Sequence, residues 1–354
     1  MSNNTPDNGF IFVEQTPGGE GKEKSQITYS QLLNGPEINA LASFPTTFRR
    51  MTFTYKPVLG DRALFQPDDV KTTIPLDHLS GPVGTAILTF FYFLKKLTKQ
   101  TPFDHKNIDF QDKKTRTILL DTEEFLRMRG RKITPSNKKE ASKEIKSILS
   151  ILSATLVDYT VPGEPRPTGG YHLLSAEIEP GRYYKYFAVL INYDLMKYLT
   201  SLNFIMNLPD PAFSIVEKEH PNAFSLVYFL SYYYGKNYYK KNKGKISLVS
   251  LLQHVSDIPS LDEIKGDRHA YRRIIEALER DLDYLRDEKK ILKDYYWANP
   301  GGEPLTNTQL EKYNYETLSE CILIYEMRDF PEVKWKELEA PKDTKKKLKA
   351  PKKV

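Results

Sequence analysis

The sequence predicts an α+β protein in which one order of helices and strands occurs twice along the chain. Segments with apolar residues at helical spacing alternate with short runs rich in β-branched and aromatic residues, and Gly, Pro and Asn separate them. The chain has 354 residues, enough for two domains with cores of their own. No apolar run is long enough to cross a membrane. Cys321 is the single cysteine, which excludes an internal disulfide, so we expect a cytoplasmic protein.

The first copy begins with an apolar helix after Pro82 and continues into a short strand over 116–120. Asp121 is expected to cap the next helix, with Glu124 three residues later as in a capping box, and Gly130 ends that helix. The copy therefore reads helix, strand, helix, turn, helix and β-hairpin. The later segments are a helix, three strand-like runs and a closing helix over 138–152, 154–161, 170–179, 183–192 and 193–202.

The second copy repeats this order. Two helices with a short strand or turn between them come first, and a long helix from His269 runs into an aromatic strand. The breaker NPGG and a polar segment then lead to a last strand. In chain order the segments are 223–235, 245–248, 249–257, 269–289, 290–298 and 320–326.

This order of elements is typical of the winged helix, a helix-turn-helix followed by a strand pair as the wing. We therefore expect an α+β fold of two tandem winged-helix domains with disordered termini. The expected divisions are a disordered N-terminal extension, two domains and a Lys-rich flexible tail, over 1–36, 37–204, 205–330 and 331–354.

The formal net charge of +6 comes from the tail alone. Residues 341–354 hold seven Lys and one Asp, so the rest of the chain is about neutral. A basic tail is weak support for nucleic-acid binding, because such runs are commonly solvated. A stronger case needs basic residues on particular faces of the folded part.

The third helix of the second copy has such a face. Helical spacing assigns a buried stripe to Tyr271, Ile274, Ile275, Leu278, Leu282 and Leu285. Because the pair Gly266–Asp267 marks the helix start, four basic residues fall in its first turns, where a helix-turn-helix contacts base edges. Arg can make a bidentate contact to guanine there. The candidate readers are Arg268, His269, Arg272 and Arg273, with Arg280 further along the same side.

The third helix of the first copy carries Lys139, Lys143 and Lys146 opposite its apolar stripe. Lys contacts tend to hold phosphates without reading sequence. A loop from Lys236 to Lys245, which includes Lys240 and Lys241, has five Lys and no acid. Any one of these stripes alone is typical of a solvated surface. Two stripes on the two third helices favour DNA binding.

The segment ISLVSLLQHVSDIPSLDEIKGDRHAYRRIIEALERDLDYLRDEKKILKDYYW, above all RRIIEALERDLDYL before an aromatic wing strand, resembles the C-terminal winged helix of bacterial plasmid replication initiators. The tandem layout over 80–327 fits as well. The resemblance implies binding to direct repeats (iterons) in double-stranded origin DNA and recruitment of the host initiator ATPase and replicative helicase. It also implies homodimers joined through the first domain, which can repress their own gene. The main readers would be those of the second domain.

Two other functions remain open. A transcriptional repressor or mobile-element regulator of the same fold would have the same DNA-binding surface. His269 and Arg272 also match the HxxR of tyrosine recombinases, with Tyr295 or Tyr296 downstream, although these tyrosines lie in a strand-like segment rather than on a helix. The six His form no HxH pair, and GGEGKEK lacks the spacing of a phosphate loop. We therefore expect no enzymatic activity, metal or cofactor.

Overall fold

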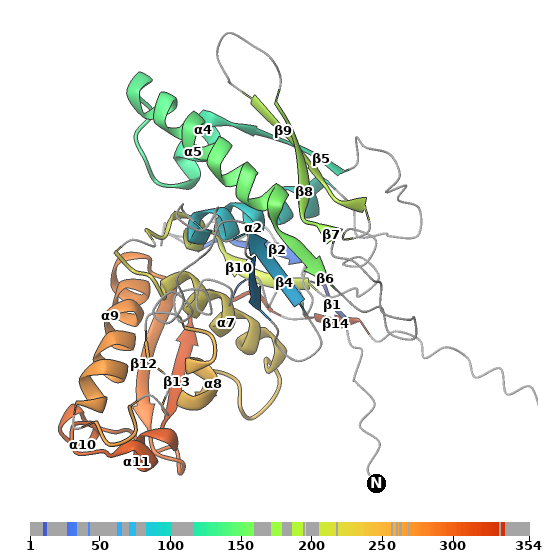
Figure 1. The fold of residues 1–354 in the computed structure, drawn as a ribbon. Coiled ribbons are helices and arrows are strands. Elements are labelled where there is room, and N and C mark those ends of the chain that lie inside the picture. The colour runs from blue at the N-terminus through green and yellow to red at the C-terminus, as the bar shows by residue number, and fades with distance from the viewer. Residues whose placement is uncertain are drawn as a thin grey trace, which may run out of the picture.

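The described residues form both helices and strands, as the α+β prediction requires (Figure 1). No helix within the described ranges is long and apolar enough to span a bilayer. The computed structural model describes residues 10–12, 27–33, 42, 62–65, 71–75, 83–100, 116–158, 171–178, 186–193, 195, 205–216, 219–255, 258–259, 261, 264–267, 269–332 and 334–336.

The predicted repeat of element order is present in the structure. The first copy contains α2 (Val83–Gln100), β5 (Thr117–Asp121), α4 (Thr122–Met128), α5 (Pro135–Ala154), β8 (Leu174–Ile178) and β9 (Tyr186–Ile191). Its sheet has the order β5-β9-β8, with all neighbours antiparallel. The first strand therefore pairs with the last.

The second copy has the same topology. It contains α7 (Ala223–Lys236), β11 (Lys245–Ser247), α8 (Leu248–Leu252), a long helix, β12 (Leu292–Ala298) and β13 (Ile322–Met327). The long helix consists of a π-helical turn η5 (Arg272–Glu276), then α9 (Ala277–Asp283) and a second π-helical turn η6 (Tyr284–Glu288). The sheet order β11-β13-β12 again pairs the first strand with the last.

Local capping explains where the helices of the first copy begin. The Asp121 carboxylate accepts from the backbone N–H of Glu123, as expected of a cap. The predicted capping box does not close, because Glu124 instead accepts from the Tyr92 hydroxyl and from Lys96. Helix α5 begins three residues earlier than predicted, since Thr134 caps it and Pro135 occupies its first turn.

Two strands lie within 1–36, where disorder was expected. Strand β2 (Tyr29–Leu33) pairs with β10 (Ile205–Pro209), and β1 (Phe10–Phe12) pairs with β14 (Lys334–Lys336). Strand β14 likewise lies in the range assigned to the flexible tail. Local composition could not reveal these pairings, because each partner comes from far along the chain. Most of the closing helix expected over 193–202 and the tail 341–354 lie outside the described residues.

A second sheet lies beside the first copy. It has the order β3-β4-β6-β7 and is antiparallel throughout. Its strands are β3 (Arg62–Phe65), β4 (Lys71–Pro75), β6 (Leu156–Asp158) and β7 (Tyr171–His172).

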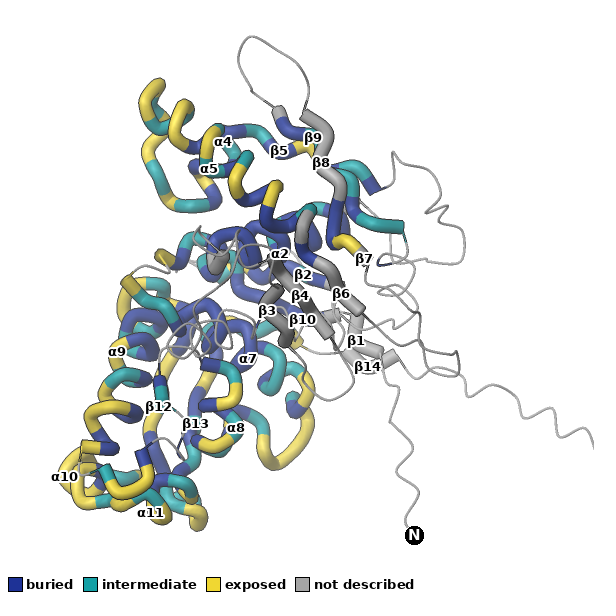
Figure 2. The backbone as a smooth tube through the Cα atoms, viewed as in Figure 1, coloured by how far each residue is buried: buried dark blue, intermediate teal, exposed yellow. Residues whose placement is uncertain are grey.

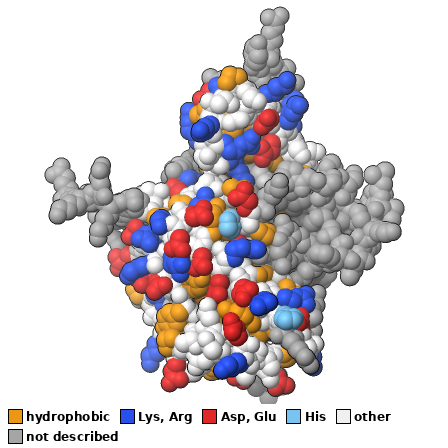
Figure 3. Space-filling view, turned by 90° about the vertical axis from the view of Figure 1, so that its left-hand side faces the viewer, with side chains coloured by type: hydrophobic (Ala, Val, Ile, Leu, Met, Phe, Trp, Pro, Cys, Tyr) orange, Lys and Arg blue, Asp and Glu red, His pale blue; other side chains and the backbone are white. Residues whose placement is uncertain are grey.

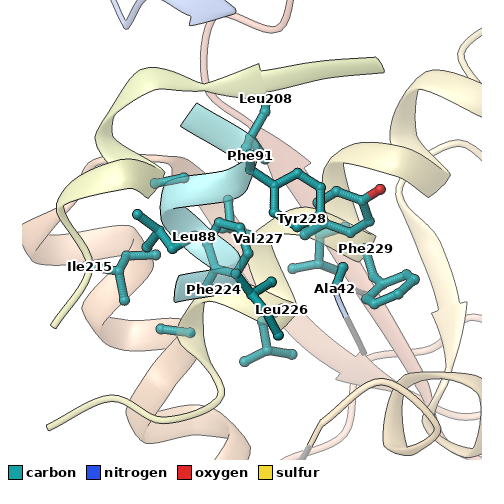
Figure 4. Close-up of a cluster of buried hydrophobic side chains, with 14 of the residues drawn as sticks. Ala42, Leu88, Phe91, Leu208, Ile215, Phe224, Leu226, Val227, Tyr228 and Phe229 are labelled. Atoms are coloured by element: carbon teal, nitrogen blue, oxygen red, sulfur yellow. The ribbon is translucent and has the colours of Figure 1, made fainter. Parts of the chain in front are cut away.

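The two copies share one hydrophobic core. Helix α2 of the first copy packs near α7 of the second, where the Phe91 ring lies 5.5 Å from Phe224 and 5.0 Å from Tyr228 between centroids (Figure 4). Leu208 of β10 and Ile215, which follows the short helix η3 (Asp210–Ser214), are buried in the same cluster. The buried residues run without a break from one copy to the other (Figure 2). This core fixes how the two copies are arranged.

Candidate nucleic-acid interface

The long helix of the second copy begins at a capped turn. Gly266 has φ +85°, a conformation that favours glycine, and the next residue, Asp267, accepts a hydrogen bond of 2.8 Å from the backbone N–H of His269. All residues of the predicted apolar stripe are buried, which confirms which side of the helix faces the core. They are Tyr271, Ile274, Ile275, Leu278, Leu282 and Leu285.

The predicted basic residues of this helix face solvent. His269, Arg272 and Arg273 are exposed in its first turns, and Arg280 is exposed further along. Arg272 forms no ion pair with any residue in the described part of the chain. Arg268 lies outside the described residues, so its predicted role remains a prediction.

Arg273 differs from Arg272 because Asp267 holds it. The guanidinium donates through Nη1 to Asp267 Oδ2 at 2.7 Å, while Oδ1 of the same carboxylate accepts from the N–H of His269. These hydrogen bonds hold the pKa of Asp267 below its usual value, the His269 N–H first and Arg273 second. The carboxylate therefore connects the helix start to one edge of the Arg273 side chain.

The basic character is confined to the first turns. Carboxylates are interspersed with Lys and Arg over the side of the molecule that carries α9 (Figure 3). Toward the helix end, Arg286 pairs with Asp283 at 2.8 Å and with Asp287 at 2.7 Å. The surface there offers little net positive charge to a phosphate backbone.

A polar segment of the predicted wing forms two further helices, α10 (Asn307–Leu310) and α11 (Tyr315–Ser319). Thr306 caps the first with a complete capping box, and Asn314 caps the second. Residues 299–321 carry four Glu and one Lys. This acidic segment packs on α8 and lies near the start of the long helix, where Lys265 Nζ is 5.8 Å from the centre of the Tyr315 ring.

Asp281 anchors the long helix to α7, a role not predicted from the sequence. Its carboxylate is fully buried and accepts from the backbone N–H and the side-chain Nδ2 of Asn222, at 3.3 and 3.1 Å. His220 Nδ1 lies 3.1 Å from the other oxygen, and its ring stacks on Tyr284 at 3.6 Å. Asn222 precedes α7, so these contacts fix the long helix against the first helix of its copy.

The two tyrosines considered as nucleophiles lie on strand β12. The Tyr295 hydroxyl donates to Asp283 at 2.7 Å. Burial, and then this hydrogen bond, raise the pKa of the Tyr295 phenol far above its usual value. Tyr296 is exposed, but it lies on a strand as well. A phenol with a raised pKa is a poor nucleophile at neutral pH.

Among the described residues, no group of three His, Cys, Asp or Glu could hold a metal ion.

Helix α5 presents part of its predicted lysine stripe. Lys139 and Lys143 are exposed and form no ion pair within the described ranges, whereas Lys146 is half-buried. Nearby Arg131 is neutralised by Glu144 at 2.7 Å and Glu140 at 3.4 Å. Helix α5 and α9 both lie toward the left-hand side of the molecule in Figure 1.

Lys240 and Lys241 lie elsewhere. Both are exposed in the segment between α7 and β11. Strand β11 is one edge of its sheet, and β12, against which η6 packs, is the other edge. This segment is accordingly exposed on the side away from α9 (Figure 2).

No protein-family model and no curated protein matches the chain. Solved structures similar to it include the Pi initiator protein in complex with iteron DNA, at 11% identity over 85% of this chain and 97% of that one, with a TM-score of 0.45. Two structures of domains 2 and 3 of RctB are also similar. One has 12% identity over 68% of this chain and 85% of that one (TM-score 0.35), and the other has 14% over 62% and 76% (TM-score 0.31).

The expected resemblance to initiators thus appears again among solved structures, since Pi is an initiator protein. All three TM-scores are below 0.5 and the identities are 11–14%.

Proposed function

We propose that this chain is a sequence-specific DNA-binding protein that initiates replication from origin repeats. The observation that carries the proposal is the set of exposed basic residues in the first turns of the long helix, above all Arg272 and Arg273. Their positions match where a helix-turn-helix contacts base edges in the major groove. The acidic character of the rest of the helix limits close DNA contact to these turns.

The repeated topology supports two tandem winged helices within this proposal. In each copy a helix, a strand and two helices precede a strand pair, and the first strand joins the sheet beside the last. In the second copy α8 and the long helix form the helix-turn-helix, and β12 and β13 form the wing. In the first copy α4 and α5 take the same places, with Lys139 and Lys143 as phosphate contacts.

The initiator role rests on the sequence resemblance of the second copy. It includes direct repeats of double-stranded DNA as the target, and the host initiator ATPase and replicative helicase as partners in the cytoplasm. It also includes a homodimer formed through the first copy. We propose no catalytic activity. Binding of a single inverted repeat at a promoter, instead of direct repeats beside an A·T-rich stretch, would favour a repressor.

The test is a matched set of alanine variants titrated against DNA. Selection from a random duplex pool first defines the preferred site. Arg273→Ala is expected to cost about 1–3 kcal/mol on that site and to relax preference at one base position. Arg272→Ala should act similarly. Lys143→Ala should weaken binding to preferred and scrambled duplexes by the same factor, because a phosphate contact carries no sequence information.

All titrations are made at one salt concentration, since affinity depends steeply on salt. Equal losses on preferred and scrambled duplexes for Arg273→Ala would make the helix a phosphate clamp and remove the basis for base reading. None of these replacements touches a buried side chain, so thermal melting should be unchanged.

Asp267 gives a second prediction about the same site. In Asp267→Asn the side-chain oxygen can still cap the helix, because Asn is as good a cap as Asp. The ion pair to Arg273 is lost. We expect the ratio of preferred-site to scrambled-site affinity to fall, while scrambled-site affinity rises because a negative charge is removed. Glu276→Gln, which removes an exposed charge on the same helix, is the matched control. If the affinity ratio changed equally in Asp267→Asn and Glu276→Gln, the loss of a negative charge alone would explain the effect.

A further inference from the structure

Residues 236–245, from the last residue of α7 to the first residue of β11, form a compact loop that we call the lysine loop. It contains five Lys, two Tyr and no carboxylate. Lys240, Lys241 and Lys245 are exposed and form no ion pair within the described part of the chain. As shown above, the loop lies at the sheet edge opposite to the one that carries the long helix. It therefore goes beyond the surface used in the proposed function.

The loop is held in one conformation. Backbone hydrogen bonds join Lys240 N to Asn237 O at 2.8 Å and Lys243 N to Lys240 O at 3.1 Å. Gly244 has φ +67°, and its carbonyl accepts from Tyr325 N at 2.8 Å. A Cβ at this glycine would collide with the carbonyl oxygen of Tyr325, so the backbone approaches β13 closely. Little conformational entropy remains to be lost when a ligand binds.

Two aromatic rings, Tyr238 of the loop and Tyr234 of α7, lie close to one ammonium group. Lys243 Nζ lies 3.7 Å from the centre of the Tyr238 ring and 4.7 Å from that of Tyr234. Tyr239 stands on Tyr238 in an edge-to-face arrangement, with 5.0 Å between the ring centres. The Tyr239 side chain is 59% exposed, more than any other large hydrophobic residue in the described part of the chain. A flat apolar ring is thus presented among exposed Lys side chains.

We infer that the lysine loop binds single-stranded DNA, with Tyr239 stacking on a base and Lys240 and Lys241 contacting the backbone. An exposed aromatic ring among lysines is the combination that non-specific single-strand binders use. A duplex does not fit as well, because its base faces are covered by neighbouring base pairs. The loop and the long helix, on opposite sheet edges, can then hold an unpaired strand and a duplex at once.

The test is fluorescence anisotropy of the full chain with a labelled thymidine oligonucleotide of about 16 nucleotides. Raised salt suppresses binding that depends on charge alone. Under these conditions Tyr239→Ala is expected to lower single-strand affinity about tenfold, the size of one lost stacking contact. Tyr239→Phe should keep wild-type affinity, because its ring can still stack. Tyr296→Ala removes an exposed tyrosine from β12 and serves as the matched control, with no loss expected.

Two further measurements separate this surface from the duplex site. Tyr239→Ala should leave preferred-duplex affinity unchanged, and the double variant Arg272→Ala/Arg273→Ala should leave single-strand affinity unchanged. Loss of the Tyr239 effect would overturn this inference alone, whereas loss of the Arg effects would overturn only the proposed function. In wild-type protein, a bromouracil-substituted strand irradiated in the complex should crosslink to the peptide that contains Tyr239.

Three results would contradict the inference. Wild-type single-strand affinity in Tyr239→Ala is the first. An equal loss in Tyr239→Phe is the second, because it would assign the effect to the hydroxyl group. A crosslink that maps only outside the lysine loop is the third, and it decides the matter even where a variant folds poorly.

Discussion

Phe91→Ala is expected to lower the free energy of unfolding by about 3–5 kcal/mol, the usual cost of emptying a buried phenylalanine site. Phe91 is fully buried and contacts Phe224 and Tyr228 of the other copy. Because both copies contribute to this core, we expect scanning calorimetry to give one transition that moves to lower temperature as a whole.

Leu119→Ala is the matched control for this prediction. Leu119 lies on β5 and is 52% exposed, so its loss should change stability by no more than about 0.5 kcal/mol. Two separate transitions, of which only one responds to Phe91→Ala, would show that the copies unfold independently and that their contact contributes little.

Asp281→Ala is expected to destabilise the protein by about 3 kcal/mol, because it leaves buried donors without an acceptor. The backbone N–H and the Nδ2 of Asn222 both donate to this carboxylate, and His220 loses its partner as well. Denaturant unfolding followed by circular dichroism measures the change.

Glu276→Ala removes a carboxylate from the exposed side of the same helix and should shift stability by no more than about 0.5 kcal/mol. Equal stability of the two variants would mean that the Asp281 contacts are worth no more than their cost of desolvation. A clear difference would show that this buried carboxylate holds the long helix in place.

Much of the second copy could be predicted from residue spacing alone. The apolar stripe from Tyr271 to Leu285 is buried as expected, because helical periodicity depends only on local sequence. The same spacing places Asp281 on that stripe, three residues after Leu278 and four before Leu285. A carboxylate on the buried stripe thus indicated a polar contact that holds the long helix, but its partners near α7 could not be predicted from the sequence.

Other features depended on contacts between distant segments. Strand β2 pairs with β10 across about half of the chain, so its local polar composition suggested disorder instead. Lys240 and Lys241 were identified by charge alone, and the strand order is what places their loop at the sheet edge away from β12. Helix α10 had a sequence signal, since Thr306 and Gln309 have capping-box spacing.

The core shared by α2 and α7 has a consequence for the geometry of any bound site. If α5 and the long helix both contact one duplex, the rigid core fixes the distance between their two contact points on the DNA. Each base pair inserted between the two contact points rotates one of them by about 34–36° around the DNA axis. Such an insertion moves the two contact points to different sides of the duplex. Only an addition of about one full helical turn returns them to the same side, and it increases the distance between them along the DNA.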